Sequence, residues 1–463
     1  IVRNPFYCHE PLALFQHDSH YPNPPLAGGS FLSVKSGISG LRQTRPMCRV
    51  FFCPSLSHHL GATMNQNVEQ PDFRYLDAAN RLGLLCQGPA AGVAYWQPAG
   101  QRLYSRLKQF ILSAHEKEGY LEVRTPSLTS IELFAQSGHL DRYRENMFFA
   151  NQLPEAEAEP GGYALRPMSC PNHIVLYKGV RRSYRELPLR FFEFGEVFRN
   201  EPSGSLQTLF RQRQFCQDDS HVFVAENQMV AALSGYLRMA DRVYRRLGFE
   251  KGSYAISLRP EKRFGDDAQW DRAEEALRHA CRENGIDWKE LPGEGAFYGP
   301  KIELQVLDKL GRAWQLGTLQ LDYVLPRRFD LSFINAEGHE EVPVLLHHAV
   351  LGSLERMIGI LLESLGVHLP EWLHPYEAVV VPVSDKAADY ARACAERLRA
   401  RWPGIREDLS QDPLGAKLRG WKQKGCPNIF VVGEKEAEKF EKGEGMSVAL
   451  DGKSVLVHTL LVR

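Results

Sequence analysis

Hydrophobic and polar residues follow one another along most of this chain with the two periods that are typical of helices and strands. Apolar side chains recur every three or four positions in residues 103–118, which predicts an amphipathic helix. Helices are also expected over residues 227–247 and 352–365. Runs with strand character lie at residues 120–123, 189–199, 210–223, 301–307, 313–316 and 319–324. Because strands adjoin strands here, with helices interspersed, we expect a largely antiparallel sheet in an α+β domain.

The pattern changes after residue 374. A continuous apolar strand is expected over residues 377–382, followed by helices over 386–401 and 413–424 and a strand over 429–432. This alternation indicates an α/β unit whose strands are covered on both faces. We therefore predict two folded domains, residues 64–374 and residues 375–463. The second has a size, about 90 residues, that can fold alone.

The first 63 residues differ from the rest of the chain. They are rich in Pro, Ser, Gly and His, their only acidic residues are Glu10 and Asp18, and they show no sustained amphipathic period. One interpretation is an organellar transit segment, which would be poor in acidic residues. The other is that translation begins at Met64 and that the upstream residues are not folded protein. Residues 1–63 are therefore predicted to be a leader or non-folded segment, and a mitochondrial or other organellar location stays open.

Composition narrows the class of protein. The 56 Lys and Arg residues balance 56 Asp and Glu residues, which excludes binding of nucleic acid through bulk positive charge alone but not through local basic patches. The longest apolar runs fall far short of the ~20 residues needed to span a bilayer, so no membrane association is predicted. The nine cysteines are scattered, odd in number and never spaced as Cys-x-x-Cys. This argues against a disulfide framework and favours a reducing, cytoplasmic setting.

Two segments carry arginines in places that suit a phosphate, although the signatures Gly-x-Gly-x-x-Gly and Gly-x-x-x-x-Gly-Lys-Ser/Thr are absent. Arg199 ends one predicted strand, and Arg211 and Arg213 open the next. In a hairpin the latter two would share one face, where guanidinium groups can bind phosphate oxygens in pairs. Arg356 lies near the start of a predicted helix, whose first backbone amides also attract anions. On spacing alone, solvated surface arginines are the better explanation of both segments.

Together these segments resemble motifs 2 and 3 of class II aminoacyl-tRNA synthetases, and VRTP at 123–126 resembles motif 1. Longer strings narrow the resemblance to the threonyl-tRNA synthetase family. They are RPMSCPNH (166–173), SYRELPLR (183–190), FRNEPSGSL (198–206), QDDSH (217–221), RPEKRFGDDAQWDRAE (259–274), GEGAFYGPKIE (293–303), QLGTLQLDY (315–323) and VPVLLHHAVLGSLER (342–356). The resemblance runs from about residue 72 to the C-terminus. It implies a class II catalytic domain, an anticodon-binding domain and a form lacking the N-terminal editing domain.

The resemblance implies one catalytic zinc ion per subunit, held by Cys170, His221 and His347. One thiolate and two imidazoles leave an open position on tetrahedral Zn²⁺. In the family, the amino group and the hydroxyl of threonine both reach the metal, whereas valine lacks the hydroxyl. A pocket that only fits shape rejects such an isostere by about 10²-fold, so a metal that requires the hydroxyl is a stronger filter. Serine keeps both groups, and we expect it to be misacylated unless a separate trans-editing protein removes it.

The implied enzyme is a threonine–tRNA ligase, which makes threonyl-adenylate from threonine and MgATP and transfers the threonyl group to the 3′ end of tRNA(Thr). The resemblance assigns to ATP the residues Met168, Arg199, Glu201, Arg211, Phe215, Gln315 and Arg356, and to threonine Gln217, Asp219, Tyr298, Lys301 and Gln320. Arg199 and Arg356 would act in catalysis, and Asp219 would accept the proton of the threonine hydroxyl. His139 matches a family histidine that would help to take the ribose proton in the second step, for which a neutral imidazole is suited near pH 7.

The C-terminal domain resembles the anticodon-binding domain of class II synthetases. Glu436 matches an acid that contacts the anticodon, and a basic helix face that suits phosphates is expected from Lys417, Arg419, Lys422 and Lys424. The chain departs from the family at residues 447–450, where an arginine that reads an anticodon base is missing. Gln214 also stands where motif 2 usually has glycine, and no helix is expected to close the domain.

The motif 1 likeness implies a homodimer. Two other classes of function compete with the ligase. A related enzyme could form the aminoacyl-adenylate and pass it to a carrier protein instead of tRNA, which the missing anticodon arginine favours slightly. A catalytically inactive tRNA-binding or regulatory protein would be expected to have lost at least one of the residues that bind the metal or the phosphates, and none of Cys170, Arg199, His221, His347 and Arg356 is lost.

Overall fold

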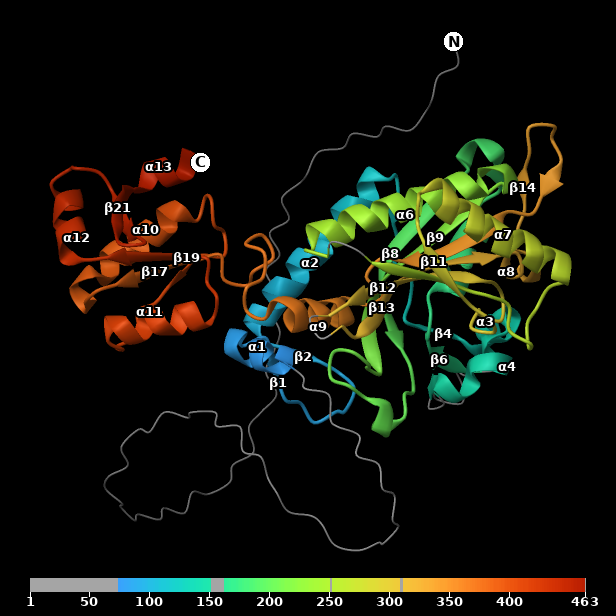
Figure 1. The fold of residues 1–463 in the computed structure, drawn as a ribbon, viewed down its shortest axis with the longest axis horizontal. Coiled ribbons are helices and arrows are strands. Elements are labelled where there is room, and N and C mark those ends of the chain that lie inside the picture. The colour runs from blue at the N-terminus through green and yellow to red at the C-terminus, as the bar shows by residue number, and fades with distance from the viewer. Residues whose placement is uncertain (1–73, 151–161, 250–251, 309–310, 463) are drawn as a thin grey trace, which may run out of the picture. The chain divides into compact units, whose positions relative to one another are not determined.

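The computed structural model describes residues 74–150, 162–249, 252–308 and 311–462 (Figure 1). The predicted leader, residues 1–63, and the predicted start of the first domain at residue 64 lie outside the described residues. The described chain contains a large, mainly antiparallel sheet and, near its C-terminal end, a smaller mixed sheet. The fold class expected from the sequence, an α+β domain followed by an α/β domain, is confirmed.

The large sheet has eight strands in the order β11-β10-β12-β13-β16-β9-β8-β3. Neighbouring strands from β10 to β8 run antiparallel, and only the two edge pairs, β10–β11 and β3–β8, are parallel. The strands are β3 (Leu121–Glu122), β8 (Leu189–Phe198), β9 (Gln214–Val224), β10 (Ser253–Ser257), β11 (Trp288–Leu291), β12 (Lys301–Leu307), β13 (Ala313–Asp322) and β16 (Val344–Ala349). The sequence-based expectation of a largely antiparallel sheet is therefore correct.

Strand β13 replaces two predicted strands. Residues 313–316 and 319–324 were expected to be separate, whereas Ala313–Asp322 is continuous. The apparent break is at Gly317, which lies inside the strand. A Cβ atom there would lie 2.9 Å from the carbonyl oxygen of Val350 and 3.0 Å from the hydroxyl of Tyr236. Glycine is thus required by a close approach of neighbouring atoms and does not mark a turn.

The hairpin of β8 and β9 is also shorter than predicted at one end. Residues 210–213 were expected to open the second strand, but β9 begins at Gln214. The amides of Phe210 and Arg211 instead donate to the carbonyl oxygen of Gln207, which closes a tight loop. Arg211 and Arg213 therefore lie in a loop before the strand, and the alternation of a strand does not decide where they point.

Helices cover the large sheet and supply its core. The main ones are α1 (Arg74–Leu82), α2 (Pro98–Lys117), α5 (Cys170–Lys178), α6 (Met229–Arg246), α7 (Asp267–Glu283) and α9 (Leu354–Leu365). Helix α2 starts at Pro98, a residue whose missing N–H suits the first helical position. Its predicted apolar stripe is buried at Leu103, Leu107 and Ile111. Helices α6 and α7 pack on each other and on the sheet (Figure 1).

Shorter elements complete this part of the chain. Two small three-stranded sheets have the orders β4-β6-β5 and β15-β14-β7, and β1 pairs with β2. Their strands are β1 (Leu85–Cys86), β2 (Tyr95–Trp96), β4 (Leu128–Ser130), β5 (Phe148–Ala150), β6 (Tyr163–Leu165), β7 (Arg182–Ser183), β14 (Phe333–Ile334) and β15 (Glu340–Glu341). The short helices are α3 (Ile131–Ser137), α4 (His139–Tyr143) and α8 (Leu325–Arg328).

The C-terminal sheet has five strands in the order β18 (Arg406–Glu407), β17 (Ala378–Pro382), β19 (Asn428–Val432), β20 (Ser447–Leu450) and β21 (Lys453–Leu456). The continuous apolar strand β17 is buried on both faces. Val380 packs with the side chains of α10 (Ala388–Leu398), and Val381 packs with Trp421 of α11 (Leu414–Gln423). Helix α12 (Glu434–Glu441) follows β19.

A short helix, α13 (Val457–Val462), follows β21, so the expectation that no helix closes this domain is wrong. Val457 and Leu460 are buried in the core beneath the C-terminal sheet. The apolar run that the sequence shows after Ser454 is thus a strand followed by a helix. Periodicity alone does not separate the two in so short a segment.

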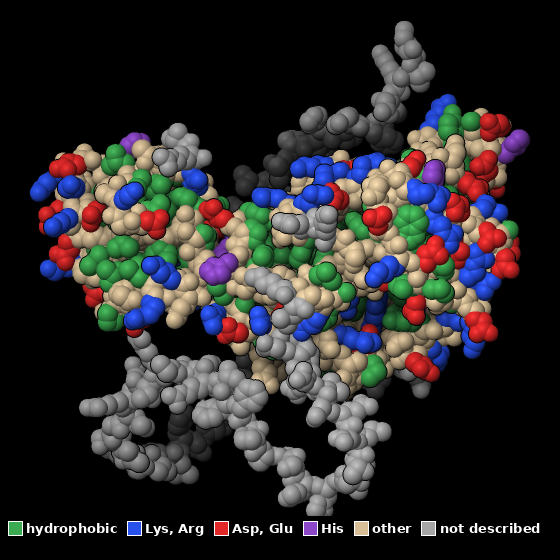
Figure 2. Space-filling model, in the orientation of Figure 1, with side chains coloured by type: hydrophobic (Ala, Val, Ile, Leu, Met, Phe, Trp, Pro, Cys, Tyr) green, Lys and Arg blue, Asp and Glu red, His purple; other side chains and the backbone are tan. Residues whose placement is uncertain are grey.

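Within the part of the chain that the structure describes, no helix combines the length and the hydropathy needed to span a membrane. Acidic and basic side chains are interspersed over the face of the molecule seen in Figure 2, as the balanced composition predicts.

Candidate active site

A cavity of about 450 Å³ opens over strands β9, β12, β13 and β16 and beside the start of α9. All the residues that were assigned to ATP or threonine line it, together with two of the three predicted metal ligands, Cys170 and His347. These lining residues are Met168, Arg199, Glu201, Arg211, Phe215, Gln217, Asp219, Tyr298, Lys301, Gln315, Gln320 and Arg356. Residues far apart in the sequence are thus brought to one cavity by the antiparallel sheet.

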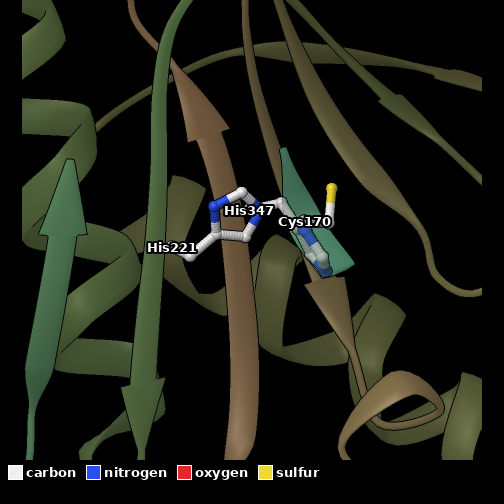
Figure 3. A group of neighbouring side chains, drawn as sticks. All are labelled: Cys170, His221 and His347. Atoms are coloured by element: carbon white, nitrogen blue, oxygen red, sulfur yellow. The ribbon is translucent and has the colours of Figure 1, made fainter. Parts of the chain in front are cut away.

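The three predicted metal ligands meet at one end of this cavity. His221 on β9 and His347 on β16 are direct cross-strand partners, and Cys170 is the first residue of α5. Their ligand atoms all lie within 4.8 Å of one another, and the three side chains are buried (Figure 3). A thiol and two imidazoles at this separation form a donor set that matches tetrahedral zinc with an open position.

The hydrogen bonds of the two histidines leave one ring nitrogen of each free for a metal. His221 Nδ1 lies 2.8 Å from His173 Nδ1, and His347 Nε2 lies 2.9 Å from Asp322 Oδ2. The opposite nitrogens, His221 Nε2 and His347 Nδ1, are buried and have no partner among the described residues. Asp322 fixes the proton of His347 on Nε2, which leaves a lone pair on Nδ1. Two orphaned buried nitrogens beside a thiol are what a bound cation would satisfy.

A buried ion pair supports the outer side of His221. Glu193 accepts hydrogen bonds from the backbone N–H of Thr125 at 2.9 Å and from Arg166 Nη1 at 2.6 Å. Its carboxylate also lies 3.4 Å from His173 Nε2. Burial alone would raise the pKa of Glu193, but His173, Arg166 and the Thr125 amide lower it to about 2. The carboxylate therefore stays charged and orients His173 toward His221.

The surroundings of Cys170 disfavour its thiolate unless a cation lies beside it. Burial raises the pKa of the Cys170 thiol well above its ordinary value, and the nearby carboxylates of Asp219 and Asp322 raise it further. A thiol in these surroundings ionises only if a positive charge compensates for the loss of water. The arrangement therefore fits a bound metal ion better than a free reactive cysteine.

The other end of the cavity is rich in guanidinium groups. Arg356 donates from Nε to the carbonyl oxygen of Phe210 at 2.9 Å and from Nη1 to that of Gln315 at 3.1 Å. Burial lowers its pKa, and the charges of Arg199 and Arg211 lower it further. Three mutually repelling cations around one space form a site for a polyanion.

Glu201 is the acidic residue nearest this group of arginines. Its Oε2 accepts from Arg211 Nε at 2.9 Å, and the guanidinium of Arg199 lies 5.1 Å from the centre of the Phe215 ring. Arg213, which was expected to share a face with Arg211, does not line the cavity: its Nε donates to the backbone of Glu201 at 3.0 Å. The expectation that Arg211 and Arg213 share one face of a strand is therefore wrong, because both residues lie in the loop before β9.

Polar groups line the space between the arginines and the metal ligands. The hydroxyl of Tyr298 donates to Gln320 Oε1 at 2.6 Å, and Lys301 Nζ pairs with Glu303 at 2.8 Å. Asp219 is almost fully buried, and burial raises its pKa. The space can hold a small molecule with both donors and acceptors, as an amino acid has.

His139 lies behind the wall of the cavity. It is fully buried, its Nδ1 is 2.8 Å from the hydroxyl of Ser137, and its Nε2 is 3.3 Å from the sulfur of Met168, which lines the cavity. Burial lowers the pKa of His139 to about 4, and the neighbouring His347 and Arg199 act in the same direction. The imidazole is therefore neutral, and Met168 separates it from the open space.

The predicted basic face of the C-terminal helix is divided. Lys417 is buried and its Nζ donates to the carbonyl oxygen of Asp408 at 3.2 Å, whereas Arg419 and Lys422 are exposed. Lys424 lies over the Trp421 ring at 4.4 Å. Glu436 accepts from the backbone amide of Gly433 at 3.0 Å, near the start of α12. Lys417 thus contributes to the domain's own packing, and the exposed charge of α11 is smaller than expected.

Sequence reasoning missed the residues that orient the metal ligands. His173 and Asp322 each hydrogen-bond to a predicted ligand, and Glu193 holds His173. His173 and Asp322 lie inside the quoted strings RPMSCPNH and QLGTLQLDY, which was the available signal. Their function depends on contacts between separate elements, α5 with β9 and β13 with β16, which the strings do not encode.

The chain matches two family models. The tRNA synthetase class II core domain (G, H, P, S and T) matches residues 155–365, and the anticodon binding domain matches residues 377–444. Curated relatives named "Threonine--tRNA ligase" include those of Alkalilimnicola ehrlichii, 42% identical over 371 residues, and Polynucleobacter asymbioticus, 43% identical over 376 residues. These matches cover 80% and 81% of this chain but only 57% and 58% of the relatives, so the chain spans little more than half of their length.

Solved structures agree with these matches. A structure described as the RNA binding domain of threonyl-tRNA synthetase from Cryptosporidium parvum Iowa II is 36% identical with a TM-score of 0.78, and the match covers 84% of this chain and 96% of that one. A putative threonyl-tRNA synthetase from Aeropyrum pernix is 30% identical with a TM-score of 0.67, with coverage of 79% and 86%. A prolyl-tRNA synthetase from Giardia lamblia, 18% identical, shares the fold. The chain belongs to the threonyl-tRNA synthetase family of class II aminoacyl-tRNA synthetases.

Proposed function

We propose that the protein is a threonine–tRNA ligase, which activates threonine with ATP and transfers the threonyl group to the 3′ end of tRNA(Thr). The observation that carries this proposal is a single cavity with a zinc-type donor set at one end and three arginines at the other. The first suits a small molecule that bears an amine and a hydroxyl, and the second suits a polyphosphate. The family membership and the match to an anticodon binding domain support tRNA as the acceptor.

Zinc is the cation that the donor set fits best. Cys170, His221 and His347 would hold it, since the two free imidazole nitrogens and the thiol are buried within ligand distance of one another. When bound, zinc would supply the coordination positions that the amine and the hydroxyl of an amino acid can occupy together, its coordination number rising from four to five. Asp219, beside this position, would accept the hydroxyl proton, and Tyr298 would meet the amino group. Gln217, Lys301 and Gln320 would complete the pocket.

The nucleotide would lie along the arginine end as its magnesium complex. Arg199 would contact the α-phosphate and the carboxylate of the amino acid, so that one guanidinium holds the attacking carboxylate and the phosphate that it attacks, while pyrophosphate leaves. Phe215 and Arg356 would enclose the adenine, and Glu201 would accept from its amino group. Arg211, Gln315 and Met168 border the same space. All these groups are held by backbone or side-chain contacts before the nucleotide arrives, which favours catalysis by preorganisation.

The second step needs a group that takes the proton of the ribose hydroxyl. His139 is neutral, as a proton acceptor must be, because burial lowers its pKa to about 4. Its Nε2 faces the sulfur of Met168 and not the open cavity. We therefore propose that His139 acts in transfer only after Met168 moves aside, which predicts a loss of transfer without a loss of activation in His139→Ala.

Serine tests the limits of the proposed selection. Valine lacks the hydroxyl, and a site built to bind a hydroxyl rejects the analogue without it by roughly 10⁴-fold or more. Serine offers the same amine and hydroxyl and lacks only one methyl group, which is worth about 10–200-fold in a pocket. We propose that the described residues activate serine measurably and that correction requires an editing activity, supplied by another domain or by a separate protein.

A homodimer is part of the proposal. Large apolar side chains that are more than half exposed include Leu121 on the edge strand β3, Val175 in the last turn of α5, and Val180 just after α5. Apolar side chains of this kind near a sheet edge fit a covered surface better than a solvated one. Light scattering of the purified protein would test for a dimer. The cytoplasmic or organellar location stays a prediction.

The experiment that tests the proposed function combines metal analysis with ATP–pyrophosphate exchange. One zinc per chain is expected, with exchange that depends on threonine, is weaker with serine and is absent with valine. Charging of tRNA(Thr) then separates a ligase from an enzyme that only forms adenylates. Equal exchange with valine and threonine, or activity that survives full removal of the metal, would refute the proposed selection.

A further inference from the structure

Strand β9 presents alternate side chains to opposite sides of the sheet, as any strand does. Gln217 and Asp219 line the cavity. Asp218, between them, does not line it and is completely buried on the other side. A carboxylate buried behind a substrate cavity needs partners, and here they come from the segment that carries Arg356.

Both oxygens of Asp218 accept backbone hydrogen bonds from the turn between β16 and α9. Val350 N–H donates to Oδ2 at 2.8 Å, and Leu351 N–H donates to Oδ1 at 3.0 Å and to Oδ2 at 3.0 Å. Among the described residues, no Lys or Arg pairs with this carboxylate. Its negative charge is therefore stabilised by backbone amides: those of Val350 and Leu351 in the turn, and its own.

A second buried carboxylate ties the same two segments in the opposite direction. Glu355, in the first turn of α9, accepts from the backbone N–H of Cys216 on β9 at 3.0 Å. Its other oxygen accepts from the hydroxyl of Tyr104 on α2 at 3.0 Å. Asp218 of the strand thus holds the turn, and Glu355 of the helix holds the strand. We call this pair the carboxylate clamp.

Close contacts and a left-handed glycine restrict the backbone of the turn that the clamp holds. Gly352 has φ +77°, and a Cβ atom there would lie 2.3 Å from the carbonyl oxygen of Leu316. The carbonyl oxygen of Gly352 accepts from Gln217 Nε2 at 3.2 Å, and the hydroxyl of Ser353 accepts from the backbone N–H of Arg356 at 3.1 Å. The position of Arg356 in the cavity therefore follows from the turn, and the turn follows from the clamp.

We infer that Asp218 and Glu355 are positioning residues for the nucleotide: together they lock the β16–α9 turn so that Arg356 is in place before ATP binds. Neither residue lines the cavity, so both act through the backbone. Because the neighbours of Asp218 on β9, Gln217 and Asp219, belong to the proposed amino-acid pocket, the clamp also joins the two halves of the site. This inference rests on the proposed function, in which Arg356 contacts ATP.

The charges around the clamp make it sensitive to pH. Asp218 is near Asp219 on its own strand and near Tyr236 and Tyr244 of α6, and His348 of β16 lies on the same side of the sheet. Glu355 is near three other groups, Tyr104, Cys216 and Glu196 of β8. Burial raises the pKa of Asp218 and that of Glu355 to about 7. Protonation of Asp218 below that pH places a hydrogen where the amide of Val350 or Leu351 donates, so ATP binding should weaken as the pH falls from 8 to 6.

The test uses Asp218→Asn and Glu355→Gln in the full chain, with two readouts: the Kd for ATP by calorimetry, and KM for ATP and for threonine in pyrophosphate exchange. An amide keeps one acceptor oxygen and replaces the other by an NH2 group, which is a donor. In Asp218→Asn this donor would face the N–H of Leu351, which donates to both carboxylate oxygens. In Glu355→Gln it would face the N–H of Cys216 or the hydroxyl of Tyr104. The Kd and KM for ATP are expected to rise about tenfold or more, while KM for threonine changes less than about threefold. The dependence of the Kd on pH should be weaker in each variant than in the unaltered protein.

Glu363→Gln is the matched control. Glu363 is a buried carboxylate on the same helix, but it pairs with Arg312 at 2.6 Å and does not line the cavity. Its replacement should lower thermal stability and leave the Kd for ATP unchanged. An unchanged Kd in both Asp218→Asn and Glu355→Gln, or equal rises for ATP and threonine, would overturn the clamp.

The two proposals fail in different ways. If the unaltered protein binds ATP but does not activate threonine, the proposed function is wrong while the Kd values still decide the clamp. If it does not bind ATP at all, both are wrong. Should one clamp variant fail to fold, the other decides, through its Kd for ATP and through the weaker dependence of that Kd on pH than in the unaltered protein.

Discussion

Replacement of His173 by alanine should weaken metal binding although His173 is not a ligand. Its Nδ1 lies 2.8 Å from Nδ1 of His221, whose other nitrogen, Nε2, is the one left free for a metal. For Nε2 to carry a lone pair, the proton of His221 must sit on Nδ1, and His173 must accept it. His173 then carries its own proton on Nε2, 3.4 Å from the charged carboxylate of Glu193. The hydrogen bond between the two histidines, with the charge of Glu193 near His173 Nε2, thus selects the tautomer that can bind metal.

The size of the effect follows from what His173→Ala removes. His221 is fully buried, so its Nδ1–H would lose its partner at a cost of about 1–3 kcal/mol, and the ring would gain freedom to turn. Loss of such an outer partner typically lowers metal affinity by about 10–100-fold. His173→Asn keeps an acceptor oxygen in the side chain and should retain more of the affinity.

The assay is competition for zinc against a chelator of known affinity, with zinc content measured after equilibration. His115→Ala is a matched control, because His115 is also a buried histidine but stacks on Phe192, 4.1 Å between ring centres, and its Nδ1–H donates to the carbonyl oxygen of Ile111. It should lose stability and keep its zinc affinity. If His173→Ala held zinc as tightly as the unaltered protein, the tautomer argument would be wrong.

Three further predictions concern the nucleotide end of the cavity. Arg356→Lys loses at least one of the two bonds that Arg356 makes to the carbonyl oxygens of Phe210 and Gln315, and should raise KM for ATP by about tenfold in pyrophosphate exchange. Gly352→Ala places a methyl group 2.3 Å from a carbonyl oxygen in a left-handed conformation, so it should destabilise the fold by more than the ~1–2 kcal/mol of that conformation, measured as a lower Tm. In Glu355, burial raises the pKa from 4.5 to about 7 in the folded state, so the folded protein holds the proton more tightly than the unfolded chain. The stability that the unaltered protein has relative to Glu355→Gln should therefore fall by about 3 kcal/mol as the pH rises from 4.5 to 7, and then stay constant, in denaturant titrations at several pH values.

Most of the secondary structure could be predicted because hydrophobic residues recur in the sequence with the periods of helices and strands. Strand β12 was located at both ends, and α9 and β17 to within one or two residues. The misses have physical reasons. Gly317 looks like a break but is a strand residue under close contact, and the loop at residues 210–213 is set by hydrogen bonds to Gln207 that a hydrophobic pattern does not contain.

The candidate site was predictable by a different route. Nothing in the spacing of Cys170, His221 and His347 brings them together, and only the family resemblance paired them. The antiparallel sheet then explains the pairing, because β9 and β16 place His221 directly opposite His347. The outer partners His173 and Asp322 could not be predicted in the same way, since their roles depend on which ring nitrogen each neighbouring histidine leaves free.

The carboxylate clamp gives a reason for burying two carboxyl groups, Asp218 and Glu355, whose burial does not stabilise the fold. A buried acid whose pKa is raised makes the folded state less stable at neutral pH than a neutral residue of the same shape would. Asp218 and Glu355 both have this property, and neither forms an ion pair among the described residues. Glu363, on the same helix, is paired with Arg312 and contributes to the fold in the ordinary way. The unpaired carboxylates lie between the two segments that carry Gln217 and Arg356. They therefore lower the stability of the fold, and in return they fix the positions of side chains in the cavity. Measured against Glu355→Gln, the stability and the ATP affinity of the unaltered protein should therefore respond to pH in opposite directions, with the stability difference rising and the affinity difference falling as the pH drops below 7. A purely structural role of these residues would not produce this combination.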